Sequence, residues 1–453
     1  MGDLRWKAPQ PVKAWTGTKD CTKFSASPIQ NDPKPFSCWT EEFIAPPSPL
    51  SEDCLYLNVW TSDPSKKTKR PVFVWIYGGG FGSGSSACAI YDGAEYAKAG
   101  IVFVSVNYRV GALGFMAHPD LTKEGNGTSG NYGLMDQVAA LKWVKENITA
   151  FGGDPDQVTI AGQSAGSMSI NALVATPTAK GLFRGAIAQS GGIFGGLNFK
   201  GLKQGEDMGA ALQKKLNAKS LAEMRALPAD SILHASGGMG GGGLAFAPIM
   251  DGKFLPADPK KAFTEGSFNA VNLMAGWVTG DGGLMGVQKT DKDTFVMTIN
   301  ERYGAKADKV LSLLPHATDA EAVKSLGDLG LISFAISAAY RLAAFNPKPS
   351  YVYQFSHVPT DKPGFPNYGA FHTSEVPFAL RNLHTWNRPW QAMDRTVEQA
   401  MSNYWINFIK TGNPNGNGQP KWEPFKSGKI LEIGDVVASR EAIHKDLVSV
   451  IFQ

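Results

Sequence analysis

The stretch TIAGQSAGSMS, residues 159–169, decides the fold. Ser164 has a glycine two residues before it and another two residues after it, and an apolar run precedes this pentapeptide. A strand that turns sharply into a helix needs such glycines, because side chains there would collide with the neighbouring strand and helix. Ser164 is therefore a candidate nucleophile; the alternative is a small residue in a tight turn.

Further apolar segments surround this stretch. Runs rich in Val, Ile and aromatic residues predict strands at residues 71–80, 100–109, 157–166, 183–192 and 350–357. Apolar spacing predicts helices within 133–151 and 292–345. Alternating strands and helices predict an α/β fold with a mostly parallel, doubly wound central sheet and helices on both faces. With no clear linker or repeat, we expect residues 1–453 to form a single domain.

Composition restricts the function classes. The net charge is only +4 over 453 residues, and charged residues make up 19% of the chain, without long runs of one sign. This argues against nucleic acid or an anionic membrane as a partner. The longest apolar runs fall far short of the ~20 residues that span a bilayer. The oligomeric state stays open.

The four cysteines, Cys21, Cys38, Cys54 and Cys88, all lie in the first quarter of the chain. They fit one or two disulfides, whose pairing the sequence alone does not select. A metal site is less favoured, because the chain has no Cys-x-x-Cys and no histidine before His118.

A nucleophilic serine needs hydrogen-bond donors for the oxyanion that forms during attack on a carbonyl. The stretch YGGGFGSG, residues 77–84, offers an unobstructed backbone at the end of a predicted strand. The N–H groups of Gly79, Gly80 and Ala165 are the candidate donors. The alternatives are a plain glycine-rich turn or a phosphate loop, although the latter would need a Lys and a Ser or Thr that are missing.

A nucleophilic serine also needs a histidine as general base and a carboxylate that orients the histidine. In α/β folds that carry a serine at such a turn, these three residues follow one another along the chain in the order serine, acid, histidine, so we choose the base and the acid by their positions. His372 lies in NYGAFHTSEVPF, a loop rich in small residues after the predicted strand at 350–357. Asp281 lies in a glycine-flanked loop just after a short apolar stretch predicted to be a strand, and no other carboxylate occurs between Glu265 and Asp291. Asp281 would accept the second ring N–H of His372.

These residues resemble the type-B carboxylesterase and lipase family, which includes the cholinesterases. Seven collinear blocks carry the resemblance: SEDCLYLNVW (51–60), VWIYGGGF (74–81), VSVNYRVGALGF (104–115), FGGDPDQVTIAGQSAG (151–166), AIAQSGG (186–192), FHTSEVPF (371–378) and YWINFIKTGNPNG (404–416). The resemblance implies an α/β-hydrolase fold, no cofactor, no metal, and hydrolysis of small carboxylic esters through an acyl-serine.

When the family's functional residues are carried over to the matching positions, the resemblance supports Ser164 as nucleophile, His372 as base, and Gly79, Gly80 and Ala165 as oxyanion donors. It also implies three structural pairs, which are Arg5 with Glu52, Arg109 with Asp154, and a Cys38–Cys54 disulfide. The given chain has no visible signal peptide, but the resemblance and this disulfide suggest a secreted or periplasmic protein. Cys21 and Cys88 match nothing in the family pattern.

The chain departs from the family pattern at three points. Asp281 stands where the family usually has glutamate, and Gln163 stands before the nucleophile where the cholinesterases have glutamate, which weakens the case for a choline-type substrate. The first residues, MGDLRW, match a point inside the family pattern, so the chain is expected to lack the family's N-terminal strands.

Substrate choice is expected to lie with residues near the serine. The candidates are Phe81, Gln163, Phe194, Leu284 and Met285. The leading hypothesis is a serine carboxylesterase. The alternatives are an inactive adhesion or binding protein of the same fold, and an amidase, lactonase or toxin-ester hydrolase.

Overall fold

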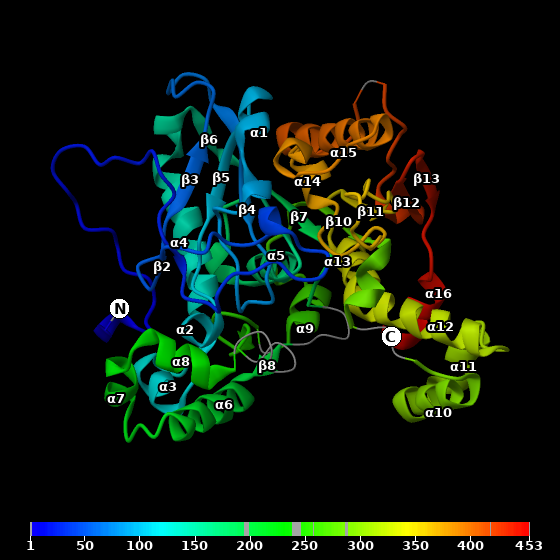
Figure 1. Ribbon diagram of the computed structural model, residues 1–453, viewed down its shortest axis with the longest axis horizontal. Helices are drawn as coiled ribbons and strands as arrows, with labels where there is room; N and C mark the ends of the chain where they lie inside the picture. The colour runs from blue at the N-terminus through cyan, green and yellow to red at the C-terminus, as the bar shows by residue number, and fades with distance from the viewer. Residues whose placement is uncertain are drawn as a thin grey trace.

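The computed structural model describes residues 2–193, 199–237, 246–256, 258–285, 289–416 and 418–452. Within these residues, nine strands form one central sheet (Figure 1). Across the sheet they are β13 (Val437–Glu441), β12 (Lys429–Ile433), β11 (Ser350–Phe355), β10 (Asn272–Val278), β7 (Gly185–Gln189), β6 (Gly153–Gln163), β4 (Arg70–Ile76), β5 (Val102–Val106) and β3 (Leu57–Trp60). Only the outermost pairs, β12–β13 and β3–β5, are antiparallel. The expected mostly parallel sheet is confirmed.

Two short pairs lie outside this sheet. One joins β1 (Ser27–Pro28) to β2 (Leu50–Ser51), and the other joins β8 (Lys200–Gly201) to β9 (Ile249–Met250).

Helices flank the sheet. Their bounds are α1 (Ala94–Lys98), α2 (Gly111–Phe115), α3 (Pro119–Glu124), α4 (Tyr132–Asn147), α5 (Ala165–Ala175), α6 (Leu202–Lys215), α7 (Leu221–Ala226), α8 (Ala229–Ser236), α9 (Pro259–Thr264), α10 (Lys292–Tyr303), α11 (Ala307–Ser312), α12 (Asp319–Leu331), α13 (Ser337–Phe345), α14 (Val376–Ala379), α15 (Ala392–Thr411) and α16 (Lys445–Phe452). Helices α4 and α5 pack on β6, α15 packs on β4 and β6, and α13 packs on β10 and β11. This fold class, α/β with a mostly parallel sheet, is the one expected.

The strand register brings several strand ends to one edge of the sheet. Ile76 of β4 is level with Gly162 of β6, and Gln163 is level with Gln189 of β7. Val278 at the end of β10 is level with Phe355 at the end of β11. The loops that follow these strands therefore open at the carboxyl edge, where open α/β sheets bind their ligands.

The five strands predicted from their apolar runs are present as β4, β5, β6, β7 and β11, and the short strand expected before Asp281 is present as β10. Central strands are easy to find because both of their faces are buried; every residue of β5 and β7 is buried. The edge strands β3 and β13, and β12 beside β13, were not among the expected strands. All residues of β3 are half-buried and most of β13 is exposed, so neither forms a continuous apolar run.

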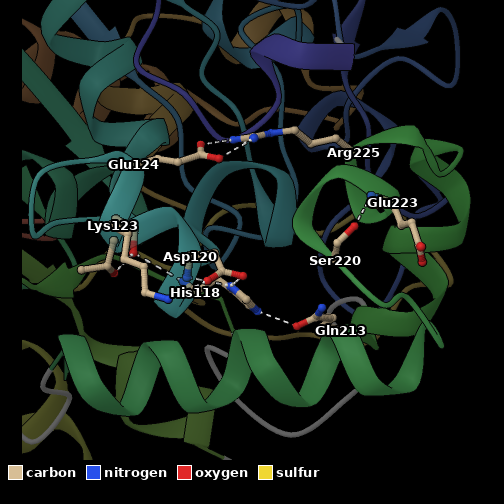
Figure 2. A network of polar contacts seen from close by, with 10 residues as sticks. His118, Asp120, Lys123, Glu124, Gln213, Ser220, Glu223 and Arg225 are labelled. Atoms are coloured by element: carbon tan, nitrogen blue, oxygen red, sulfur yellow. Dashed lines mark hydrogen bonds and ion pairs between the residues drawn. The ribbon is translucent and has the colours of Figure 1, made fainter.

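The N-terminal segment is held to the body of the protein by arginines. Arg5 pairs with Glu52 through two short contacts of 2.8 and 2.5 Å, which confirms that expected pair. Figure 2 shows Arg225 of α7 reaching Glu124 at the end of α3, with nitrogen-to-oxygen distances of 2.9 and 2.7 Å. Arg225 also donates to the backbone oxygen of Arg5. In the same view His118, before α3, contacts Gln213 of α6 at 2.8 Å.

The second expected pair is wrong, because Arg109 pairs with Asp136 instead of Asp154. The guanidinium lies 2.8 and 2.7 Å from the two carboxylate oxygens of Asp136, which sits on the buried side of α4. Asp154 instead accepts from the backbone N–H of Asp156 and from the side chain of Gln157. Asp136 meets Arg109 because α4 packs beside the loop that follows β5.

The Cys38–Cys54 disulfide is also wrong. All four cysteines belong to the described residues, and all are free thiols. Cys38, Cys54 and Cys88 are buried and Cys21 is exposed. Burial raises the pKa of Cys38 to about 11 and that of Cys54 and Cys88 to about 12, so all three are neutral thiols at physiological pH. The suggestion of a secreted or periplasmic protein loses this support.

One helical stretch in the described part of the chain, Asp319–Phe345, is long and apolar enough to cross a membrane by length and composition. Because 67% of its most apolar window is buried inside the protein, it has the character of a core helix.

Candidate active site

Ser164 occupies the turn between β6 and α5. Its backbone has φ +58° and ψ −123°, a conformation that residues with side chains rarely adopt. The turn is tight because α5 begins directly against β4. A Cβ on Gly166 would lie 2.1 Å from the backbone oxygen of Ile76, and one on Gly162 would lie 2.6 Å from the same oxygen. Both flanking glycines are therefore sterically required, and the turn presents Ser164 at the carboxyl edge.

Asp281 and His372 meet beside this serine. The backbone N–H of Gly280 donates to the oxygen of Ala370 at 2.9 Å, which joins their two loops. His372 Nδ1 lies 2.5 Å from Asp281 Oδ1, and both residues are buried. The N–H of Val278 donates to the other oxygen of Asp281 at 3.1 Å. With Nδ1 as the donor to the carboxylate, the lone pair of the neutral ring is on Nε2.

The side-chain amide of Gln163 lies against the ring of His372. Its nitrogen is 3.1 Å from Nε2 and 3.5 Å from Nδ1, which places it over the ring and off the direction of the Nε2 lone pair. The hydroxyl of Ser164 makes no hydrogen bond to any other residue that the structure describes, although Ser164 and His372 line the same cavity.

The glycine-rich stretch after β4 lies against the serine. A Cβ on Gly78 would come within 2.7 Å of the backbone oxygen of Gln163 and within 3.0 Å of Ser164 Cβ. The backbone N–H groups of Gly79, Gly80 and Ala165 donate to no other residue within the described ranges. Ala165 is also the first residue of α5, so its N–H lies at the positive end of the helix dipole.

A cavity of about 460 Å³ opens above these residues. It is lined by Gln30, Asn31, Asp32, Pro33, Lys34, Phe36, Trp39, Phe43, Ile44, Ala45, Gly78, Gly79, Gly80, Gly82, Ser83, Gly84, Cys88, Tyr91, Gln163, Ser164, His372 and Thr373. Most of its wall is apolar. Its lining charges are Asp32 and Lys34, which are exposed and pair with each other at 3.0 Å.

About half of this wall comes from residues 30–45, which the sequence reasoning missed. This segment contains a short 3₁₀ helix, η2 (Glu41–Phe43), and contributes the rings of Phe36, Trp39 and Phe43. Its sequence, QNDPKPFSCWTEEFIA, is irregular and has no strand or helix period. The cluster of three aromatic residues near prolines is the signal that could have indicated it.

The expected pocket residues have different outcomes. Gln163 lines the cavity. Phe81 is not among the lining residues, because its backbone has φ +59° and its fully buried ring packs against Phe115 and Phe199. Phe194 lies outside the described residues. Leu284 and Met285 end the 3₁₀ helix η7 (Thr279–Met285), and their side chains lie outside the described part of the structure.

A second buried carboxyl group, which the sequence reasoning missed, belongs to Glu375, three residues after His372. Glu375 is fully buried, accepts a hydrogen bond from Tyr353 at 2.7 Å and contacts Ser190 at 3.4 Å. Burial raises the pKa of Glu375 to about 8; the hydrogen bond from Tyr353 is the next largest effect and lowers the pKa, and the nearby charge of Asp281 raises it further. Glu375 is therefore mostly protonated at neutral pH.

Nothing in the described part of the chain groups three or more His, Cys, Asp or Glu side chains closely enough to hold a metal ion. The polar groups at the carboxyl edge are instead a serine, an imidazole and a carboxylate, together with free backbone N–H groups. This set is suited to nucleophilic attack on a carbonyl with transfer of a proton.

A mostly parallel sheet flanked by helices, with a serine on a strand-to-helix turn at its carboxyl edge, defines the α/β-hydrolase fold. The chain belongs to the carboxylesterase family, whose pattern it matches over residues 1–447.

Three relatives illustrate the family. The chain is 36% identical to the para-nitrobenzyl esterase of Bacillus subtilis over 92% of this chain and 84% of that protein. It is 33% identical to the fumonisin B1 esterase of Sphingopyxis macrogoltabida over 98% of this chain and 83% of that protein. It is 32% identical to the human cocaine esterase over 94% of this chain and 79% of that protein. The protein is a carboxylic ester hydrolase.

Proposed function

We propose that the protein hydrolyses uncharged carboxylic esters with a triad of Ser164, His372 and Asp281. The observation that carries this proposal is the 2.5 Å contact between His372 Nδ1 and Asp281 Oδ1, because it leaves the other ring nitrogen available as a base on the serine side. The shorter side chain of aspartate suffices because the two loops are joined at Gly280 and Ala370.

The reaction would proceed in two stages. Ser164 Oγ attacks the ester carbonyl carbon while its proton passes to His372 Nε2, which gives a tetrahedral oxyanion. The bond to the alcohol oxygen then breaks, and the alcohol leaves with the proton from Nε2. A water molecule adds to the acyl-serine in the same way, its proton passes to Nε2, and the carboxylic acid leaves as Ser164 regains its proton.

The N–H groups of Gly79, Gly80 and Ala165 are proposed as the donors to the oxyanion. Two features support this role. None of the three N–H groups has another partner within the described residues, and the Gly78 backbone lies against Ser164. Each such donor typically contributes about a hundredfold or more to turnover.

The cavity supports an apolar substrate. Its aromatic rings come from Phe36, Trp39, Phe43 and Tyr91, and its charged residues lie exposed and paired. The names of the relatives refer to fumonisin B1, a para-nitrobenzyl group and cocaine, which differ widely in shape. We therefore propose an ester with a bulky apolar group as the substrate class.

The test compares purified wild type with Ser164→Ala and Asp281→Asn on p-nitrophenyl esters of graded acyl length. Turnover is expected to fall by about 10³-fold or more in Ser164→Ala, and by about 10³- to 10⁴-fold in Asp281→Asn. Ser169→Ala, a buried serine on α5 outside the cavity lining, is the matched control. Undiminished turnover in Ser164→Ala would contradict the serine mechanism. Near-normal turnover in Asp281→Asn would contradict only the assignment of the acid.

A further inference from the structure

Glu375 is a buried carboxyl group that the proposed reaction does not use, and it lies three residues after His372. Its side chain accepts a hydrogen bond from the hydroxyl of Tyr353 on β11 at 2.7 Å. It also contacts the hydroxyl of Ser190, the residue that follows β7, at 3.4 Å. The side chain therefore joins the segment that carries His372 to two strands of the central sheet.

The backbone between His372 and Glu375 forms a tight turn. The N–H of Val376 donates to the oxygen of Thr373 at 3.0 Å. The backbone oxygen of Glu375 accepts the N–H of Ala379 at 2.8 Å, which ties the end of the turn to α14. Because the turn is short and hydrogen-bonded, a displacement of the Glu375 side chain is transmitted to the imidazole.

The charges around Glu375 are a second observation. Glu375 and Asp281 are both 0% exposed, and neither pairs with a Lys or Arg in the described part of the chain. The imidazole of His372 is the partner of Asp281. The groups that face Glu375 from the neighbouring elements are an acid, a phenol, an amide and a hydroxyl, namely Asp281 of η7, Tyr353 of β11, and Gln189 and Ser190 at the end of β7.

A negative charge on Glu375 would thus be buried without a cation, which is costly. Burial raises the pKa of Glu375 to about 8; the hydrogen bond from Tyr353 opposes this effect, and the charge of Asp281 adds to it. Burial also holds the pKa of Tyr353 well above its ordinary value, so the phenol stays neutral. At neutral pH the site therefore holds one carboxylate and one carboxylic acid beside a single imidazole.

We infer that protonated Glu375 is a positioning residue that anchors the turn of His372 to the sheet, and that loss of its proton at alkaline pH displaces this turn and lowers turnover. The inference rests on the proposed triad. An ionised Glu375 gains free energy by moving toward water, and the turn moves with it. Glu375 does not line the cavity, so it acts through His372 and not on the substrate.

Glu375→Gln tests the inference, because an amide of nearly the same shape cannot ionise. Two rates are measured from about pH 7 to 10, namely kcat/KM for a p-nitrophenyl ester and the labelling of Ser164 by a fluorophosphonate. In wild type both are expected to fall about tenfold per pH unit above about pH 8. In Glu375→Gln each should stay within about threefold of its own value at pH 7.

Tyr353→Phe gives a second, independent sign. It keeps the ring but removes a hydrogen bond that favours the charged form of Glu375, so the alkaline fall should move to higher pH by up to about 1 pH unit. Glu398→Gln is the matched control, because Glu398 is a buried glutamate of α15 that pairs with Arg395 at 3.2 Å and does not line the cavity. It should keep the alkaline fall of wild type.

A fall at the same pH in wild type, Glu375→Gln and Tyr353→Phe would overturn the inference, since a purely structural role moves no limb of the profile. A wild-type profile without a fall up to about pH 10 would also overturn it. So would a loss that is not regained on return to pH 7, because such a loss indicates unfolding. Failure of the fluorophosphonate to label Ser164 in wild type at pH 7 would instead overturn the proposed triad, so the two failures are distinguishable.

Discussion

The indole nitrogen of Trp39 donates a hydrogen bond to the hydroxyl of Thr373 at 3.1 Å. Trp39 forms part of the cavity wall, and Thr373 follows His372. Thr373 has φ +86°, a strained conformation for a β-branched residue that persists only when its surroundings hold it. Phe43, from the same wall, adds contacts to Phe371 and Trp386. Residues 30–45 therefore both shape the cavity and support the loop that carries His372.

Trp39→Phe keeps an aromatic wall but removes the N–H, so kcat is expected to fall several-fold while KM changes little. Thr373→Val removes the acceptor and should give a similar loss. In a double-mutant cycle on kcat, the loss in the double mutant should be smaller than the sum of the two single losses by about 1 kcal/mol, because both substitutions remove the same hydrogen bond. Trp390→Phe is the control, because its indole donates to backbone oxygens outside the cavity wall. Fully additive losses would mean that the Trp39–Thr373 contact does not support the His372 loop.

Glu375 gives a prediction about stability and pH. Because burial raises its pKa from an ordinary 4.5 to about 8, the native protein holds a proton that the unfolded chain releases above about pH 4.5. The contribution of Glu375 to the free energy of unfolding is thus present below pH 4.5 and is lost as pH rises toward 8. Glu375→Gln removes this titration, so the stability of wild type relative to the variant should decline by a few kcal/mol, on the order of the shift, over that range.

Urea unfolding at several pH values between 5 and 8 measures this difference. A difference between wild type and Glu375→Gln that stays constant with pH would show that Glu375 ionises normally in the native protein. Glu375→Gln also removes one acceptor for the hydroxyl of Tyr353, which lowers the free energy of unfolding of the variant by an amount that does not depend on pH.

The pairing of Arg109 with Asp136 predicts a strongly destabilising substitution. Asp136→Asn leaves a buried guanidinium without its counter-charge, which typically costs about 3–5 kcal/mol. Asp154→Asn, at the position that the family resemblance implied, should cost much less. Asp156→Asn breaks the exposed pair with Lys145 and should change the unfolding midpoint little. A larger effect at Asp154 than at Asp136 would contradict the observed pairing.

The free cysteines can be counted with a thiol reagent such as DTNB. Only Cys21 is exposed, so the native protein should react at this one position, and Cys21→Ser should remove the reaction. After unfolding without a reductant, all four cysteines of the chain should react. A need for reductant before the full number appears would indicate a disulfide.

The sequence predicts the central part of the molecule well because most of the candidate residues lie directly after a buried strand. Ser164 follows β6, the glycine-rich stretch follows β4 and Asp281 follows β10, so their common edge is a consequence of parallel pairing. The contact of His372 with Asp281, expected from loop position alone, is present in the structure, while the catalytic roles of both residues stay predictions.

The remaining features depend on contacts between segments that have no sequence period. The partner of Arg109 depends on how α4 packs beside the loop that follows β5. The positions of Asp136 and Asp154 in the sequence do not indicate which of the two pairs with Arg109. Phe81 points into the core because its backbone has a positive φ, and a phenylalanine in the sequence gives no indication of such a conformation. The wall from residues 30–45 and the amide of Gln163 on His372 became visible only through tertiary packing.

The wall built from residues 30–45 also bears on how such enzymes could diversify or be engineered. It lies outside the central sheet, so its sequence can change without disturbing the strands that precede Ser164 and Asp281. It is nevertheless attached to the loop of His372 through Trp39 and Thr373. A loop transplanted from another esterase to alter substrate choice would therefore keep its turnover only if residue 373 were exchanged together with it.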